Sequence, residues 1–259
     1  MNTANLVRKE LLQMRWILIV GLIFGLVLAV IIVVTFHYME QVVAEIPSEL
    51  MELIAQHEVT RQLLFIFGDY TSYVWSQWNA KNLYQAGAIL VIVMAATQFA
   101  GEVSRRTISF YLSRPVSRKE GFIAKISAGM ITLLLVLGGA TLLTWLASSI
   151  IGLTADWGRL WGAFLISLVW LGVFYLLASI ISILNSEPIA AGVMIGVIGI
   201  VLSLPGLFAV TRDYSLFYQM RAVDFFIYQQ SLVPYLLYGI LISGVLLVIG
   251  IKVFSNRDF

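Results

Sequence analysis

Few residues of this chain have the type and spacing that catalysis or metal binding requires. The segment from His57 to Arg61 reads H-E-V-T-R and begins like the zinc motif H-E-x-x-H, but Arg61 stands where the second ligand would be. The chain has only two histidines and no cysteine, which excludes disulfides and thiolate metal sites. No glycine precedes a lysine, so the G-K-[ST] end of a phosphate-binding loop is absent. We therefore expect no catalytic residue, no metal and no cofactor bound by this chain.

The most unusual chemistry lies in a basic segment, Gly101 to Lys125, which holds six of the sixteen lysines and arginines. Within it Ile108, Tyr111 and Leu112 lie at i, i+3 and i+4, so they form an apolar stripe on a short helix. A proline after this stripe ends the helix. Such an element lies along a membrane surface, where basic residues attract anionic lipid by about 1 kcal/mol each. The residues alone leave lipid binding and docking of a partner protein equally open.

The elements that hold this segment must be membrane-spanning helices. Of the 259 residues, 60% are hydrophobic and only 12% are charged, whereas a soluble domain has roughly 25% charged residues. The hydrophobic residues form long uncharged blocks, and a block of about 18 or more residues crosses a bilayer. Each block must be helical, because lipid cannot satisfy the backbone groups of an isolated strand. The sequence predicts a single all-α integral membrane domain, 1–259, with six spans near residues 17–36, 83–100, 126–154, 160–186, 189–211 and 232–252.

The basic residues predict how the chain is oriented. With the N-terminus inside, 11 of the 16 lysines and arginines lie on the cytoplasmic side and 5 lie outside, which is the positive-inside bias of membrane proteins. Both termini are then cytoplasmic, and the chain is a multi-pass protein of the cell membrane. Before the first span, Val7, Leu11 and Met14 lie at helical spacing and predict an amphipathic helix.

Two predicted external segments, 37–82 and 212–231, are rich in aromatic residues. The first contains Tyr70, Tyr73 and two tryptophans, Trp75 and Trp78. An interfacial helix with an aromatic belt at the headgroup level is the favoured interpretation of this segment, and a substrate vestibule is the alternative. We expect the second segment to lie on the outer leaflet or to dip into it.

The spans contain no Asp, Glu, Lys, Arg or His, apart from Lys252 at the end of the last one. Proton- and ion-driven carriers keep such groups at membrane depth, where the coupling ion needs a partner. An ion-driven secondary carrier and a membrane-embedded lipid-modifying enzyme are therefore alternatives with less support than a transport subunit powered by another chain. The net charge of +2, without a basic stripe that carries interleaved aromatics, does not indicate a nucleic-acid partner.

The basic segment resembles the loop between the second and third spans of the membrane subunits of type-2 ABC transporters, the six-span permeases of bacterial exporters. That family often has an acidic residue, then Gly-Thr, then an apolar run that ends in Leu-x-x-Pro-Val-Ser-Arg. The matching residues here are Glu102, Thr107, Leu112, Pro115, Val116, Ser117 and Arg118, followed by Lys125. Arg106 stands in place of the usual glycine and predicts a continuous helix instead of a sharp turn.

The resemblance implies a coupling helix in this loop that docks on a separate ATP-binding subunit, and an amphipathic N-terminal helix at the inner leaflet. The implied docking residues are Glu102, Arg105, Arg106, Thr107, Ile108, Tyr111, Leu112, Arg114, Pro115, Val116, Ser117 and Arg118. It also implies two ATPase chains, which bind ATP and magnesium, and a second permease chain, identical or related. The substrate path would lie between the two permeases, mainly along the second and fifth spans. The apolar spans and aromatic segments favour outward movement of an amphipathic substrate, such as a lipid, a peptide antibiotic or a drug.

Overall fold

The computed structural model of the chain describes residues 3–45, 68–107 and 117–258. This part of the chain is built from helices and contains no strand, which confirms the all-α prediction. The long helices are α1 (Thr3–Gln13), α2 (Arg15–Ala44), α6 (Tyr84–Gln98), α9 (Arg118–Ile151), α10 (Trp157–Ile183), α11 (Pro188–Ser203) and α14 (Leu232–Asn256). Six helical segments are long and apolar enough to cross a membrane, namely Arg15–Gln41, Tyr70–Ser104, Arg118–Ile151, Trp157–Ile183, Pro188–Leu207 and Leu232–Asn256.

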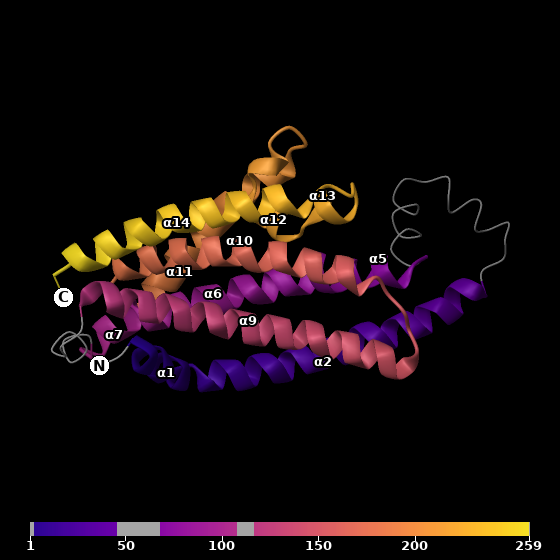
Figure 1. The fold of residues 1–259 in the computed structure, drawn as a ribbon, viewed down its shortest axis with the longest axis horizontal. Coiled ribbons are helices and arrows are strands. Elements are labelled where there is room, and N and C mark those ends of the chain that lie inside the picture. Colours follow the sequence, from indigo (N-terminus) through magenta and orange to yellow (C-terminus); the bar gives the residue numbers. More distant parts are fainter. Residues whose placement is uncertain (1–2, 46–67, 108–116, 259) are drawn as a thin grey trace.

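The long helices run side by side along the long axis of the molecule, and both chain termini lie at the same end (Figure 1). Helix α10 is central, because α6, α9, α11 and α14 all pack against it. Helix α2 packs along α9, and helix α1 packs against the beginning of α9. The end of the bundle that holds α1, α7 (Ala100–Ser104) and both termini is called the terminal end below.

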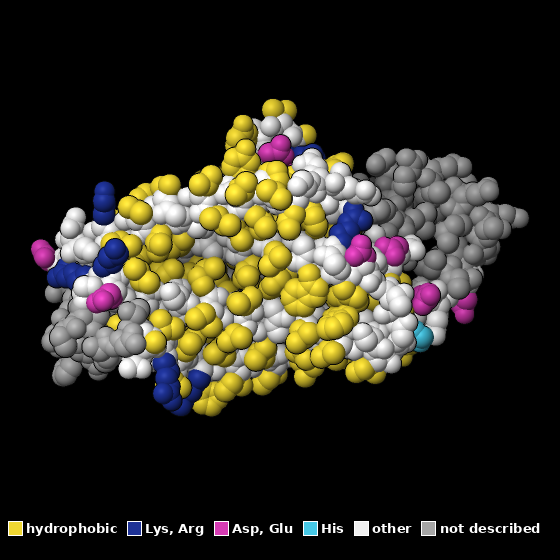
Figure 2. Space-filling view, in the orientation of Figure 1, with side chains coloured by type: hydrophobic (Ala, Val, Ile, Leu, Met, Phe, Trp, Pro, Cys, Tyr) yellow, Lys and Arg dark blue, Asp and Glu magenta, His cyan; other side chains and the backbone are white. Residues whose placement is uncertain are grey.

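The surface of the bundle has the polarity of a membrane protein. Apolar side chains cover the middle of the face in Figure 2, and lysine and arginine side chains gather toward the terminal end. Helix α14 shows the same property along its length, with large exposed side chains such as Leu237, Ile240 and Val245. Exposed apolar faces of this kind are stable where lipid replaces water.

Small residues determine how closely α2 approaches α9. A Cβ atom on Gly21 would lie 2.7 Å from the side chain of Val136, and one on Gly25 would lie 2.5 Å from the Cβ of Ala140. Both distances are too short for non-bonded carbon atoms. The two glycines therefore allow the backbone of α2 to lie directly against α9, as small residues do between membrane helices.

The aromatic residues between positions 70 and 78 are buried inside the bundle, so they do not form the expected belt at the headgroup level. Tyr70–Val74 forms helix α5, Trp75–Leu83 forms the π-helix η1, and both continue into α6. Trp78 is buried and donates a hydrogen bond from Nε1 to Thr141 Oγ1 at 2.8 Å. Tyr70 is also buried, with its hydroxyl 2.5 Å from Ser148 Oγ. These rings pack inside the bundle because α9 offers partners for their polar atoms.

The segment between α11 and α14 folds back onto the bundle as the short helices η2 (Leu204–Leu207), η3 (Arg212–Tyr214), α12 (Leu216–Met220) and α13 (Val223–Phe226). Ser167 of α10 donates a hydrogen bond to the carbonyl of Met220 at 2.5 Å. The ring of Phe226 stacks on Trp75, with centroids 4.6 Å apart and planes 2° from parallel. This segment therefore closes the bundle above α10 and η1.

Candidate functional site

Helix α9 begins with a capping box, directly after the basic loop that connects α7 to α9. Ser117 Oγ accepts a hydrogen bond from the backbone N–H of Glu120 at 3.2 Å, and the Glu120 carboxylate accepts one from the backbone N–H of Ser117 at 3.0 Å. This reciprocal pair satisfies two backbone donors that a helix start otherwise leaves open. Because α9 begins at Arg118, Lys125 lies about two turns into the helix, on its buried side.

Lys125 is fully buried and forms two ion pairs. Its Nζ lies 2.8 Å from Oε1 of Glu102 in α7 and 3.1 Å from Oε2 of Glu10 in α1. A buried charge needs such partners, and removing one side of a buried ion pair costs about 3–5 kcal/mol. Lys125 therefore joins three helices that the sequence places in separate segments: α1, α7 and α9.

A second group of polar contacts lies deeper, between α6, α9 and α10. Gln98 donates from Nε2 to the carbonyl of Lys125 at 3.1 Å and accepts a hydrogen bond from the hydroxyl of Tyr175. The Tyr175 ring lies against Gly129, where an added Cβ atom would come within 2.6 Å of three ring and hydroxyl atoms. Only glycine at position 129 leaves room for that ring. Gly129 therefore allows the Tyr175 hydroxyl to lie beside the ion pairs.

The buried face of α1 differs from the predicted one. Val7, Leu11 and Met14 define the face expected from spacing, but Leu6, Glu10 and Met14 are the buried residues. These three lie at i, i+4 and i+8, and the carboxylate in the middle is buried because Lys125 pairs with it. Val7 and Leu11 are half-buried at the edge of the same face.

The segment after Glu102 turns sharply, so the expected continuous helix at Arg106 is wrong. Arg106 has φ of 54°, in the left-handed region. The N–H of Thr107 donates to the carbonyl of Glu102 at 3.0 Å, and the N–H of Arg106 donates to Val103 at 3.0 Å. This is the Schellman pattern that ends helices, in which glycine is the usual left-handed residue. The turn is retained here with arginine, at some cost in backbone strain.

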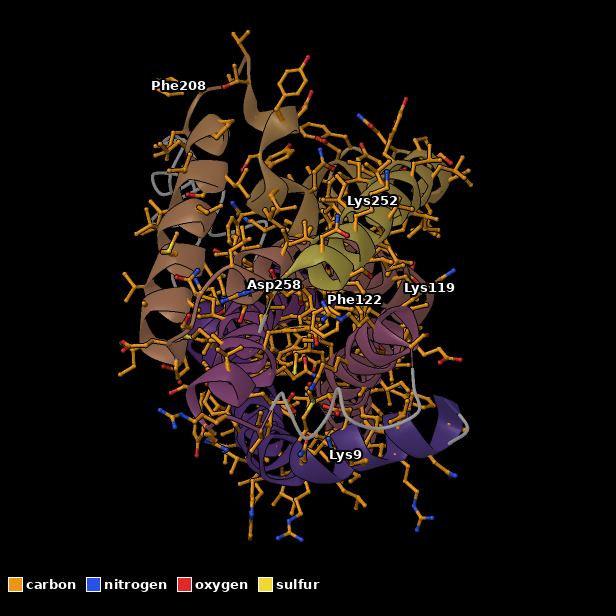
Figure 3. All side chains as sticks on the ribbon, turned by 90° about the vertical axis from the view of Figure 1, so that its left-hand side faces the viewer. Lys9, Lys119, Phe122, Phe208, Lys252 and Asp258 are labelled. Carbon is orange, nitrogen blue, oxygen red and sulfur yellow. The ribbon has the colours of Figure 1, made fainter. Side chains whose placement is uncertain are left out.

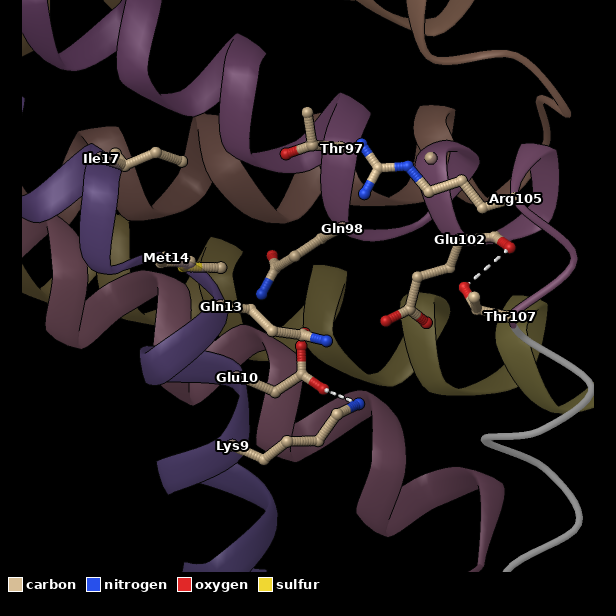
Figure 4. Close-up of a pocket in the computed structure, with 11 residues that line it drawn as sticks. Lys9, Glu10, Gln13, Met14, Ile17, Thr97, Gln98, Glu102, Arg105 and Thr107 are labelled. Atoms are coloured by element: carbon tan, nitrogen blue, oxygen red, sulfur yellow. Dashed lines mark hydrogen bonds and ion pairs between the residues drawn. The ribbon is translucent and has the colours of Figure 1, made fainter.

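A polar cavity of about 520 Å³ opens beside the ion pairs (Figure 4). Its walls come from α1, the beginning of α2, α6 and α7, and they include Lys9, Gln13, Thr97, Glu102 and Arg105. The guanidinium of Arg105 reaches back toward Thr97 in Figure 4, and the carboxylate of Glu102 is directed toward Gln13. The walls of this cavity therefore carry arginine, lysine, carboxylate and amide groups.

The C-terminal run is held at the same end by two arginines. Arg118 donates to the carbonyls of Ser255 at 2.9 Å and Arg257 at 2.7 Å. Arg257 in turn donates to the carbonyl of Asn185 at 3.2 Å, in the connection between α10 and α11. Burial lowers the pKa of the Arg257 guanidinium from its usual value. These bonds tie the end of the chain to the beginning of α9 and to the α10–α11 connection.

An aromatic cluster lies under this C-terminal run. Phe254 is fully buried, and its ring centroid lies 5.9 Å from those of Phe122 and Phe99. Viewed from the terminal end, Phe122 lies where α9 and α14 meet, and Lys119, Lys252 and Asp258 surround it (Figure 3). The ring of Phe122 packs against Gly250, which has no side chain to displace it. The last turn of α14 is thus part of the core.

The structure brings together only some of the predicted docking residues. Glu102 is in the ion-pair cluster, Arg105 faces the cavity, Thr107 ends the Schellman turn, and Ser117 and Arg118 begin α9. The other predicted positions, Ile108, Tyr111, Leu112, Arg114, Pro115 and Val116, lie outside the described residues.

Glu10 and Lys125 were not predicted as site residues, although the sequence carries a signal for them. Glu10 lies midway between two apolar residues of one helical face, and Lys125 lies between the apolar Phe122 and Ile126. A charge at such a position requires a partner of opposite sign.

Comparison with known protein families agrees with this architecture. Residues 4–246 match the family model described as "ABC-2 family transporter protein". Comparisons with curated proteins and with solved structures find no match. The family match covers all six candidate spans almost completely, together with the ion-pair cluster and the turn at Arg106. The chain therefore belongs to the ABC-2 transporter family and is a membrane-spanning permease subunit of an ABC transporter.

Proposed function

We propose that this permease works in an exporter driven by a separate ATPase subunit that docks at the terminal end of the bundle. The observation that carries the proposal is the pairing of buried Lys125 with Glu102 and Glu10. Residues 105–117 connect α7 to α9, and both helices are joined to α1 through that one ammonium group. A force applied to the loop is therefore transmitted to three helices at once.

The terminal end is cytoplasmic in this proposal. Arg8, Lys9, Arg15, Lys119 and Lys252 belong to helices at this end of the bundle. Such an excess of lysine and arginine next to span ends is typical of the cytoplasmic side. The ATPase, which needs ATP and magnesium from the cytoplasm, would then contact the loop and the exposed face of α1.

Closure of two ATPase chains would move two permease chains relative to each other. The bonds from Arg118 and Arg257 to the C-terminal run and the α10–α11 connection make the terminal end move as one body. A rigid-body change of this kind needs no charge within the spans. ATP binding would thus be converted into a rearrangement of helices without a catalytic residue in this chain.

The substrate path runs along α6 and α11 in this proposal. An apolar cavity of about 460 Å³ lies between these helices, lined by Tyr84, Ile92, Phe174, Gly196 and Phe217, among others. The outer faces of α11 are also apolar and exposed, as at Val193 and Val197. A cavity with aromatic and aliphatic walls favours an amphipathic molecule such as a lipid, a peptide antibiotic or a drug. A second permease chain, identical or related, would close the path on its open side.

Co-expression with the ATPase subunit encoded by the neighbouring gene tests this function. The permease is purified by its tag, and ATPase recovery and ATP hydrolysis are measured for wild type, Leu112→Asp and Pro115→Ala. We expect the ATPase to co-purify with wild type and to be released or uncoupled by either change. Leu237→Asn, on the exposed face of α14, is the control that leaves docking intact. Failure of any ATPase to follow the wild-type chain would contradict the proposal.

A further inference from the structure

An apolar groove between α2 and α6 lies in line with the polar cavity at the terminal end. The groove has a volume of about 220 Å³ and is lined by Gly21, Phe24, Leu28, Ala86 and Ile89, among others, with α9 as its floor. Ile17 lines the polar cavity, and Gly21, one turn further along α2, lines the groove. On the facing helix, Thr97 lines the cavity, and Ile89 lies about two turns before it. The two hollows therefore follow one line between the same two helices.

The length of this line matches one leaflet of a bilayer. From Ile17 to Leu28, α2 rises about 16 Å at roughly 1.5 Å per residue. The hydrocarbon core of a bilayer is about 30 Å thick, so the line covers about half of it. Its polar end lies at the terminal end of the bundle, where headgroups begin, and its apolar end lies near the bilayer centre.

The charges of the polar end leave one cation in excess. Lys9 and Lys125 pair with Glu10, and Lys125 also pairs with Glu102. Three cations, Lys9, Lys125 and Arg105, therefore face two carboxylates. The guanidinium of Arg105 makes no hydrogen bond or ion pair with the described parts of the chain, and it lies along the cavity in Figure 4. This excess of positive charge is complementary to a single anionic group.

We propose that this line between α2 and α6 binds one anionic phospholipid of the leaflet that adjoins the terminal end. The phosphate lies at Arg105 and Lys9, and one acyl chain lies in the groove between Phe24 and Ala86. A headgroup of net charge −1 neutralises the cluster, whereas a zwitterionic headgroup does not. The lipid also fills the groove between α2 and α6, because α2 packs mainly on α9, α6 packs mainly on α10, and the two helices make little contact with each other.

In this proposal Arg105 contacts a lipid phosphate rather than the ATPase. The residue lies in the loop region that the family resemblance associates with docking, but its side chain lines the cavity. The lipid site does not depend on export, because it is formed by this chain alone.

Photo-crosslinking in nanodiscs tests the site. The purified full chain, without an ATPase, is reconstituted with phosphatidylglycerol or phosphatidylcholine that carries a diazirine in one acyl chain. After irradiation, labelled peptides are identified and quantified by mass spectrometry. We expect labelling by the phosphatidylglycerol probe to concentrate on the groove residues of α2 and α6, near Phe24 and Ile89, and to exceed labelling by the phosphatidylcholine probe several-fold.

Two changes should reduce this labelling for different reasons. Arg105→Gln removes the excess cation, and about 1 kcal/mol per basic residue corresponds to roughly fivefold weaker binding. Ala86→Trp fills the groove and should abolish labelling of both helices. The relative labelling of other surface positions by the two probes should not change. Ala190→Trp, at an exposed position of α11 outside the groove, is the matched control and should label like wild type. Size-exclusion profiles of all variants show whether each is folded.

Two results would overturn the proposal. One is equal labelling by both probes that Arg105→Gln and Ala86→Trp leave unchanged, which indicates general contact with lipid. The other is a disulfide between two copies of an Ile89→Cys variant together with absence of groove labelling, which indicates that a second chain covers the groove. The chain has no cysteine of its own, so this crosslink has no background. Neither result bears on ATPase docking, which is measured separately.

Discussion

The Nζ of Lys125 lies 2.8 Å from Oε1 of Glu102, so an ion pair shielded from water joins the helices that precede and follow the basic loop. Glu10 of α1 completes the cluster at 3.1 Å. Both ends of the loop are therefore held at the same buried ion-pair cluster. The middle residues of the loop, 108–116, lie outside the described structure. This arrangement links both ends of the loop to the positions of α1 and α9.

Neutralising Lys125 alone should destabilise the permease strongly. Lys125→Met leaves two buried carboxylates without their cation, and breaking a buried pair costs about 3–5 kcal/mol. The triple change Lys125→Met, Glu10→Gln and Glu102→Gln removes all three charges and should regain most of that loss. Thermal unfolding of the detergent-solubilised protein measures both. Lys119→Met, at an exposed position of the same helix, is the control, and a Lys125→Met protein as stable as this control would disprove the role of the cluster.

Replacing Arg106 by glycine should stabilise the turn after α7. Arg106 has φ of 54°, and a left-handed conformation costs a non-glycine residue roughly 1–2 kcal/mol. Glycine loses more entropy on folding, so we expect a net gain of about 1 kcal/mol. Arg105→Gly, at φ of −82°, should give no gain and serves as the comparison. Unfolding temperatures of the two variants settle the point, and a loss of stability in Arg106→Gly would contradict the assigned turn.

The contact between Gly129 and Tyr175 predicts a strong effect from a single methyl group. In Gly129→Ala the new Cβ would overlap the Tyr175 ring, and overpacking of a core costs about 1–3 kcal/mol. Gly196→Ala provides a matched control, because a Cβ there meets nothing within 4 Å. That change should be neutral or slightly stabilising, since alanine favours a helix by about 1 kcal/mol over glycine. Equal stability of the two variants would refute the close contact.

The bonds of Arg118 and Arg257 should protect the C-terminal run. In Arg118→Ala the carbonyls of Ser255 and Arg257 lose their donor, and in Arg257→Ala the tie to Asn185 is lost. Both variants should show faster hydrogen exchange at the last residues, with little change in the free energy of unfolding. Lys252→Ala, at an exposed position of α14, should exchange like wild type. Unchanged protection in Arg118→Ala would show that the run is held by Phe254 alone.

Several features of the fold follow from local patterns. Long uncharged blocks predict spans because a helix satisfies its own backbone in lipid, whatever its neighbours are. The six predicted spans accordingly overlap six candidate spans of the structure, with boundaries that differ at one or both ends. The largest difference is the second span, which begins at Tyr70 instead of residue 83. The polar residues of η1 interrupt the hydrophobic block in the sequence, so the block does not reveal this part of the helix. The aromatic side chains of η1 contact α9, as in the hydrogen bond from Trp78 to Thr141.

The sequence by itself determined the class of the protein, its six hydrophobic helices and its family, because hydropathy and the loop motif are read along the chain. Tertiary structure decided which charged residues are buried. Lys125 and Glu10 are 115 positions apart, and their pairing depends on how α1 and α9 are rotated toward each other. Likewise, the left-handed turn at Arg106 ends α7 shortly after Glu102, whose carboxylate pairs with Lys125. Hydropathy along the chain cannot predict either feature, because both depend on residues that only the packing of the helices brings together.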